Sequence, residues 1–268
     1  MSSFGDQYVL SSGHTGHDRL RMLCEIHDPS TRDLLERAGL TAGHRYVEFG
    51  CGLGYVARWA ARHASSVTAV DLSDEHLKEA QRLAESDDLT NIEFVNRDIY
   101  THGLPRDAFD LSYSRWVLMH LKQPIDAMRQ IRHALKPGGI MVCEEADLSA
   151  IYTEPRTFGY EEYRTLALDT GRQRGIDYEG GRRLHTWARE AGFEIVEVGA
   201  YQPHYVAGRH KGFWSWTFEE SGRSLVEAGV IDADELGRLV GGMRLADQDS
   251  GVLVGHARNH QLIARKPA

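Results

Sequence analysis

The sequence predicts an α/β fold with a mostly parallel sheet, and three observations support this class. Short segments rich in apolar and β-branched residues alternate with segments of helical composition over residues 30–145. A glycine-rich stretch connects the first apolar segment to a helix. The chain has 268 residues, 41% of them apolar, which is enough to bury a core without disulfides or a structural metal. We therefore expect one large domain in which right-handed crossovers join neighbouring strands.

Local signals define the first elements. A helix is expected over residues 30–38, because this stretch ends at a glycine of the kind that follows helix C-termini. The apolar strand 46–49 runs into an alanine-rich helix at 55–64. The β-branched segment 67–70 is typical of a strand that is buried on both faces. Two strands and two helices therefore open the fold.

The same alternation continues to residue 143. Ser73 caps the next helix, whose first turn carries acidic residues near the positive end of the helix dipole. Strands are expected at 92–96 and 109–114. Pro124 opens a further helix, and a Lys-Pro-Gly-Gly turn ends it before the strand 140–143. Five strands in this order predict a parallel sheet.

The second half of the chain is less regular. We expect helices at 161–169 and 182–191 and a strand at 193–198, after which the chain leaves the sheet and returns at 251–256 and 261–265. Two long excursions are too large to be simple loops and predict helical insertions that cover a site. The expected organisation is an N-terminal arm, 1–29, and a main domain, 30–268, that carries insertions at 146–180 and 200–250.

Composition excludes several classes of protein. The 31 Lys+Arg and 39 Asp+Glu residues give a net charge of −8, whereas domains that bind nucleic-acid phosphates are usually basic. No apolar run approaches the ~18 residues that a membrane span needs, and the first residues do not resemble an export signal. The three cysteines form no C-x-x-C pair. We expect a cytoplasmic protein that binds neither nucleic acid nor membranes.

A glycine turn and two strand-end acids carry the functional signal. Glycines between a strand and a helix let backbone N–H groups approach a ligand. Their spacing here is Gly50-x-Gly52-x-Gly54, which lacks the third glycine of the dinucleotide fingerprint. Asp71 ends the next strand, where a carboxylate can accept both hydroxyls of a ribose, and Asp98 follows the strand after it. A nucleoside-containing ligand is therefore predicted at this edge of the sheet.

These residues resemble the ordered motifs of the class I S-adenosylmethionine-dependent methyltransferases. Residues 47–54 resemble the E/D-x-G-x-G-x-G motif, and residues 70–73, 97–99, 109–121 and 135–139 resemble the motifs that follow it. The resemblance implies a Rossmann-like sheet of seven strands, the last antiparallel, and S-adenosylmethionine as cofactor, with S-adenosylhomocysteine as product. It further implies a set of cofactor-binding residues, with Tyr8 closing over the ligand: Tyr8, Glu48, Gly50, Cys51, Gly52, Gly54, Asp71, Leu72, Asp98, Ile99 and Ser114.

The acceptor and its base are open at this stage. A small organic acceptor (O, N or C), plausible in natural-product tailoring, is the leading hypothesis; the alternative is a protein that uses bound cofactor for cyclisation or rearrangement. The candidates for a general base are His120, Glu145, His14 and His17, each of which could equally be a structural residue. No metal is expected, because the His and carboxylate spacings show no convergence of three ligands. A homodimer is compatible with this hypothesis.

One segment of the second excursion is aromatic. Residues 213–218 contain four aromatic side chains in six positions. They could form a pocket for an aromatic acceptor or a cage for a cation, or they could be the buried core of an insertion. The acceptor pocket is expected in residues 1–30, 146–180 and 200–250, where the resemblance is weakest.

Overall fold

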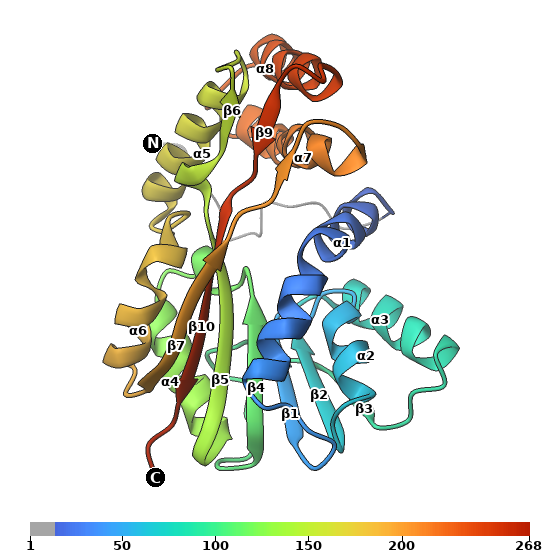
Figure 1. Cartoon of the computed structure of the whole chain (residues 1–268), viewed down its shortest axis with the longest axis vertical. Coiled ribbons are helices and arrows are strands. Elements are labelled where there is room, and N and C mark those ends of the chain that lie inside the picture. The colour runs from blue at the N-terminus through green and yellow to red at the C-terminus, as the bar shows by residue number, and fades with distance from the viewer. Residues whose placement is uncertain (1–13) are drawn as a thin grey trace. The chain divides into compact units, whose positions relative to one another are not determined.

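The computed structural model describes residues 14–268, with only the backbone of residues 14 and 15. A seven-stranded sheet has the order β3-β2-β1-β4-β5-β10-β7, with six strands parallel and the last antiparallel (Figure 1). This confirms the predicted fold class. The strands are β1 (Arg45–Phe49), β2 (Ser66–Asp71), β3 (Ile92–Asn96), β4 (Phe109–Arg115), β5 (Leu135–Asp147), β7 (Glu194–Tyr201) and β10 (Arg258–Arg265).

The chain divides into two compact units. The first, which we call the sheet unit, comprises residues 27–146, 180–200 and 259–268. The second, which we call the helical unit, comprises residues 147–179 and 201–258 together with the described residues before His27. Helix α1 (His14–Arg37) contributes residues to both units.

Helices cover both faces of the strands in the sheet unit. These helices are α2 (Tyr55–Ala61), α3 (Asp74–Ser86), η1 (Leu118–His120), α4 (Pro124–Ala134), η3 (Gly180–Arg183) and α6 (Leu184–Glu190). Neighbouring residues of β1 belong to different cores: Tyr46 packs in one hydrophobic cluster and Val47 in the other. Both side chains are fully buried. A strand buried on both faces explains why the apolar runs predicted parallel strands.

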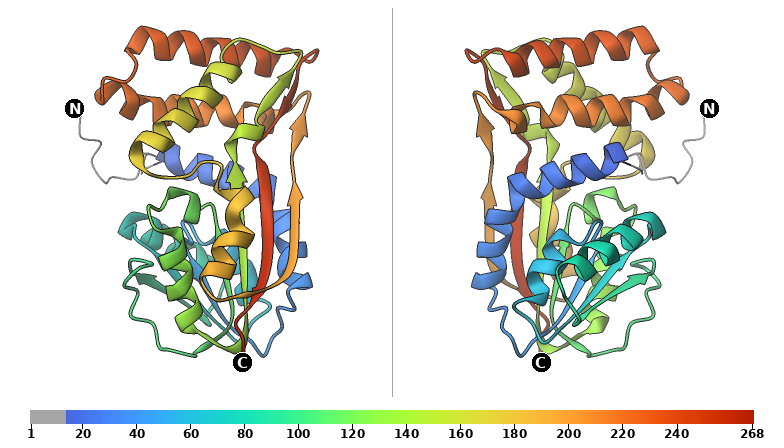
Figure 2. Two further views of the ribbon diagram at one scale, coloured as in Figure 1. Left: turned by 90° about the vertical axis from the view of Figure 1, so that its left-hand side faces the viewer. Right: turned by 90° about the vertical axis from the view of Figure 1, so that its right-hand side faces the viewer.

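The helical unit has its own packed elements. These are η2 (Leu148–Ala150), β6 (Tyr152–Glu154), α5 (Tyr160–Arg174), β8 (His204–Tyr205), η4 (Arg209–Gly212), α7 (Phe213–Glu227), α8 (Ala233–Gln248) and β9 (Leu253–Gly255). The three short strands form an antiparallel sheet, β6-β9-β8. Helices α7 and α8 run side by side (Figure 2). Of the four aromatic residues at 213–218, Phe213, Trp214 and Phe218 are buried and Trp216 is half-buried.

Several predicted boundaries were wrong. Helix α1 starts at His14 rather than at residue 30, and it includes Pro29, although an interior proline removes a backbone hydrogen bond and is unfavourable in a helix. The segment expected to return to the main sheet at 251–256 contributes β9, which pairs with β6 and β8 instead. The turn at 136–139 lies within β5, whose pairing with β4 shifts between Phe109 and Leu111.

Candidate functional site

The glycine turn after β1 depends on a left-handed backbone. Gly50, Gly52 and Gly54 have φ angles of 71°, 51° and 68°, which side chains rarely tolerate. A Cβ at Gly50 would lie 2.3 Å from Val117 Cγ2. The N–H groups of Gly50 and Cys51 both donate to the carbonyl of Val70 on β2, at 2.8 and 3.0 Å. The turn is therefore fixed against the strand that carries Asp71.

Asp71 ends β2 beside this turn. One carboxylate oxygen accepts the N–H of Gly52 at 2.8 Å, and the other accepts the N–H of Ser73 at 2.9 Å. Each oxygen has a second lone pair, so the carboxylate can still accept two hydroxyl hydrogens. Leu72 follows it with 66% of its surface exposed, although it is apolar. The end of β2 thus presents an acceptor and an apolar surface together.

The next strand end differs from the expectation in one respect. Asp98 follows β3, and one of its oxygens accepts the N–H of Tyr100 at 2.8 Å. Ile99, which we expected to pack on a purine, is buried in the hydrophobic cluster that also contains Phe49 and Val70. Asp98 keeps a carboxylate oxygen for a ligand, whereas the Ile99 side chain faces the core.

Glu48 is a buried carboxyl on β1. Its side chain accepts a hydrogen bond from the Tyr46 hydroxyl at 3.1 Å, and only 4% of the residue is exposed. Burial raises the pKa of Glu48 to about 8, although Arg115 and the Tyr46 hydrogen bond act in the opposite direction. A cationic group beside Glu48 would favour its ionised form.

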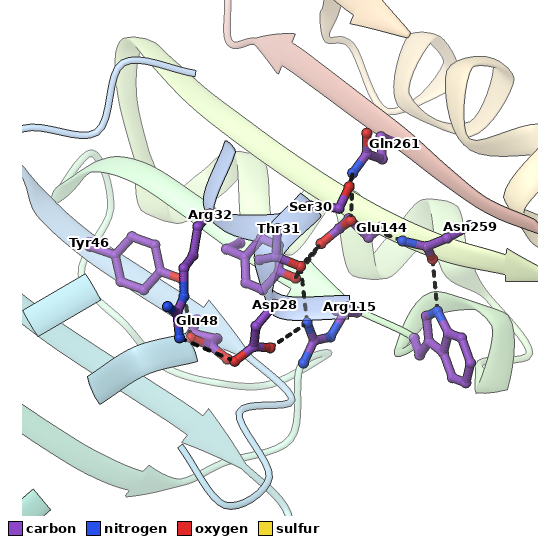
Figure 3. A network of polar contacts seen from close by, with 12 residues as sticks. Asp28, Ser30, Thr31, Arg32, Tyr46, Glu48, Arg115, Glu144, Asn259 and Gln261 are labelled. Carbon is purple, nitrogen blue, oxygen red and sulfur yellow. Dashed lines mark hydrogen bonds and ion pairs between the residues drawn. The ribbon is translucent and has the colours of Figure 1, made fainter. Parts of the chain in front are cut away.

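A buried polar network connects α1 to β4, β5 and β10 in the sheet unit, and sequence analysis did not find it (Figure 3). Arg115 donates to Asp28 and to Thr31, each at 3.0 Å. Glu144 accepts hydrogen bonds from Thr31 and, at 2.6 Å, from the Tyr113 hydroxyl. All these side chains are at least largely buried. The network therefore fixes the second half of α1 to the strands.

Two amides of β10 complete the coordination of Glu144. Asn259 and Gln261 donate to its second oxygen at 2.9 and 2.8 Å. Asn259 also accepts the indole N–H of Trp116 at 2.8 Å. Trp116 has a φ of 55°, an uncommon conformation for a large side chain. The residue directly after β4 is thus held in a strained conformation by a buried partner.

Glu145 binds the loop between β4 and α4, residues 116–123, which we call the β4 loop. Its carboxylate accepts three backbone N–H groups, from Val117 at 3.0 Å, Leu118 at 2.7 Å and Met119 at 3.2 Å. Burial raises the pKa of Glu145 to about 8 against these hydrogen bonds, which lower it. His120 ends the same short helix and is half-buried. Two of the four base candidates therefore meet at one loop.

The other predicted residues are placed as follows. Ser114 is fully buried and its hydroxyl donates to Cys143 Sγ at 3.3 Å, and burial raises the pKa of the Cys51 thiol. His17 is half-buried on α1, in the helical unit. For His14 the structure describes only the backbone, and Tyr8 lies outside the described residues.

The described residues contain neither a candidate metal cluster nor a candidate membrane span. Residues 14–268 contain no group of three or more His, Cys, Asp or Glu side chains that could hold a metal ion. Within the same residues, no helix is both long and apolar enough to cross a membrane.

Comparison with known proteins gives a consistent result. A family model described as a methyltransferase domain matches residues 47–143. The ubiquinone biosynthesis O-methyltransferase of Pseudomonas aeruginosa is 27% identical over 61% of this chain and 69% of its own length. An S-adenosyl-L-methionine-dependent Diels-Alderase of Talaromyces variabilis is 31% identical over 45% of this chain and 44% of its own. The solved cyclase SpnF shares the fold, with a TM-score of 0.59 and 22% identity over 90% of this chain and 81% of that chain.

The matched regions are partial. The chain spans between 44% and 62% of the length of the first curated relatives that it matches. The family model covers the segment that contains the glycine turn, Asp71, Asp98 and the β4 loop. The similarity is therefore concentrated on the site described above.

Proposed function

We propose, from the premise that this chain is a class I S-adenosylmethionine-dependent methyltransferase, that it transfers a methyl group to a small organic acceptor. The observation that carries the proposal is the strand-end arrangement of Asp71 beside Gly52. A carboxylate with unused lone pairs next to a turn that only glycines can form suits a ribose.

The residues present fit the cofactor. Asp71 would bind the two ribose hydroxyls, and Leu72 offers the adjacent apolar surface to the adenine ring. The glycine turn allows close approach of the methionyl portion, and Cys51 lies within that turn. Glu48 would orient the cationic amino-acid end, and Asp98 and the backbone at Ser114 complete the set. Two further residues belong to the proposed cofactor-binding set. Ile99 would contact the cofactor through its backbone, and Tyr8 would close over it.

The bound cofactor would supply an electrophilic methyl group on a sulfonium, and the protein has to position an acceptor in line with it and exclude water. The β4 loop lies at the carboxyl ends of the strands, where ligands of such sheets bind. Glu145 and Trp116 hold this loop in a defined conformation. The remaining task is to remove a proton from an acceptor that is not already ionised.

Four residues remain candidates for this proton transfer. His120 is carried by the β4 loop and is the candidate we favour there. Glu145 already accepts three N–H groups, so a role as base would require it to give up part of that coordination. His14 and His17 belong to α1. The acceptor atom, O, N or C, decides whether any base is needed.

A second function is favoured by one relative. The Diels-Alderase of Talaromyces variabilis is described as S-adenosyl-L-methionine-dependent. In this alternative, our chain would use the positive charge of its bound cofactor to stabilise a cyclisation or rearrangement. Product analysis separates the two functions, because only methyl transfer yields S-adenosylhomocysteine and a methylated product.

Location and assembly complete the proposal. We place the protein in the cytoplasm, since none of the three cysteines forms a disulfide, as is usual in a reducing compartment. The net charge of −8 supports a small-molecule substrate over nucleic acid. A homodimer is the assembly we propose to test first by light scattering.

The cofactor site is tested by replacing Asp71 with Ala. Loss of charge-assisted hydrogen bonds to ribose should weaken S-adenosylmethionine binding by about 1.5–3 kcal/mol in calorimetric titration. Glu85→Gln, a change at an exposed residue of α3, is the matched control and should bind normally. Unchanged affinity in the Asp71 variant would remove the basis of the proposed site.

A further inference from the structure

The β4 loop contacts the glycine turn of the proposed cofactor site. Val117, the second residue of the loop, has its Cγ2 atom 2.3 Å from the place that a Cβ at Gly50 would take. Its side chain therefore fills the space that this glycine leaves open. Because the contact is direct, a change in the backbone of the loop would move Val117 and alter the wall of the turn.

Trp116, the first residue of the loop, has a strained backbone. Its φ of 55° brings Cβ close to the following carbonyl oxygen, which is unfavourable for a residue with a large side chain. Among residues 14–268, the other non-glycine residues with a positive φ are Asp88 and Asp107, and aspartate tolerates this region better. Such a conformation persists only where the surrounding structure holds it.

Three contacts within the sheet unit hold Trp116 in this conformation. Its backbone N–H donates to the carbonyl of Glu144 at 2.8 Å. The ring of the buried His27 meets the indole edge-on, with the ring centroids 5.0 Å apart. The indole N–H donates to Asn259 Oδ1, also at 2.8 Å. This last bond is directional, so it fixes the orientation of the indole as well as its position.

Glu144 sets the orientation of Asn259 in turn (Figure 3). Asn259 is fully buried on β10, and its Nδ2 donates to Glu144 Oε1 at 2.9 Å. Glu144 also accepts hydrogen bonds from three other side chains, so the amide nitrogen of Asn259 must face it. The amide oxygen then faces Trp116, whose indole can only donate. The side chain of Asn259 is thus fixed at both ends.

We propose that Asn259 is a positioning residue for the cofactor. By holding the indole of Trp116, it keeps the strained loop in place and Val117 against Gly50. Without this hydrogen bond Trp116 would leave its positive φ, and the next residue, Val117, would shift away from the turn. The inference rests on the proposed function, and it extends the cofactor site to a residue of β10, outside the segment 47–143 that the family model matches.

A matched pair of substitutions on β10 tests this role. Asn259→Leu removes the acceptor of the Trp116 indole together with one hydrogen bond to Glu144. Gln261 donates to the same oxygen of Glu144 at 2.8 Å, so Gln261→Met removes an equivalent bond but leaves the contact between Asn259 and Trp116 intact. In calorimetric titration with S-adenosylhomocysteine, Asn259→Leu should bind about tenfold more weakly than the wild type, and Gln261→Met within about twofold of it.

The same hydrogen bond can be broken from its other end. Trp116→Phe keeps an aromatic ring and removes the indole N–H, so it should also weaken S-adenosylhomocysteine binding by about tenfold. The double variant Trp116→Phe/Asn259→Leu should again lose about tenfold rather than about a hundredfold, because both changes remove one shared interaction.

Hydrogen exchange gives a readout that does not depend on the cofactor. The amides of residues 117–119 are bound by Glu145, and they should exchange faster in Asn259→Leu because the loop before them is released. In Gln261→Met the exchange of these amides should match that of the wild type. Faster exchange in both variants to the same extent would indicate a general loss of stability and would contradict the positioning role.

The outcomes also separate this inference from the proposed function. Equal cofactor affinity in Asn259→Leu and Gln261→Met, or additive losses in the double variant, would overturn the inference alone, since the wild type still binds S-adenosylhomocysteine. A wild type that does not bind it would overturn the proposed function and the inference with it. If Asn259→Leu does not fold, as circular dichroism would reveal, Trp116→Phe still decides through its affinity and its hydrogen exchange.

Discussion

Glu145 uses one carboxylate to bind three consecutive N–H groups of the β4 loop. Such groups are otherwise left unpaired at the start of a helical turn, and here they are buried with the acid. These three hydrogen bonds are enough to explain why a carboxylate is buried at position 145, because it anchors the loop. The same geometry also explains why a strand-end acid, by itself, is weak support for a general base.

Removing this carboxylate should destabilise the protein more than neutralising it. We expect Glu145→Ala to lower the free energy of unfolding by about 3 kcal/mol or more, since three buried donors lose their acceptor. Glu145→Gln keeps one carbonyl oxygen and should cost about 1 kcal/mol. Urea denaturation measures both values. A stable Glu145→Ala protein that binds cofactor but has no turnover would instead support catalysis by Glu145.

At the scale of elements, α1 is the one that local sequence signals described least well. Its second half is joined to β4 and β5 through Thr31, Arg115 and Glu144. These contacts link residues far apart in the sequence, and no periodicity or motif marks them. By contrast, β3 has its predicted bounds, Ser73 caps α3 and Pro124 starts α4, because each depends on local backbone preferences.

The candidate site, like the fold, was predictable only where it depends on local sequence signals. The contact between Gly52 and Asp71 follows from parallel strands that end at one edge of a sheet, which the alternating pattern already indicates. The burial of Ile99 and the three hydrogen bonds of Glu145 depend on how the loops after the strands pack. Side-chain packing in irregular segments has no sequence signature of this kind, so these features needed the structure.

The Thr31 contacts should stabilise α1. Thr31→Val keeps the shape of the side chain but removes one buried hydrogen bond from Glu144 and one from Arg115, so we expect a loss of about 1–3 kcal/mol. Hydrogen exchange should become faster in residues 27–37 of α1. Thr41→Val, at an exposed position, should change stability by less than about 0.5 kcal/mol. Equal protection of α1 in both variants would contradict this role.

At the scale of the whole molecule, two buried acids link stability to pH. Burial raises the pKa of Glu48 and of Glu145 from 4.5 to about 8. Between these values the folded state binds protons that the unfolded state has released. The contribution of these two groups to the free energy of unfolding therefore falls as the pH rises from 4.5 to about 8, and they cause no further loss above that value.

Replacing Glu48 should reduce this dependence. Between pH 4.5 and about 8, each such carboxyl lowers the free energy of unfolding by up to about 1.4 kcal/mol per pH unit. We expect Glu48→Gln to be more stable than the wild type at pH 9 and to differ little from it at pH 4.5. Chemical denaturation at several pH values, with exposed Glu227→Gln as control, would show this. Parallel pH profiles for the wild type and Glu48→Gln would contradict the burial of an uncharged Glu48.

The division into two units also affects how this protein could be recombined. The chain passes from one unit to the other after residues 26, 146, 179, 200 and 258. Neither unit is a continuous piece of sequence, so a single crossover between two homologous genes cannot exchange one of them intact. We expect the acceptor pocket in the helical unit, and new acceptor preferences would then arise through substitutions within its separate segments. A chimaera designed to acquire another specificity would have to graft all of those segments together.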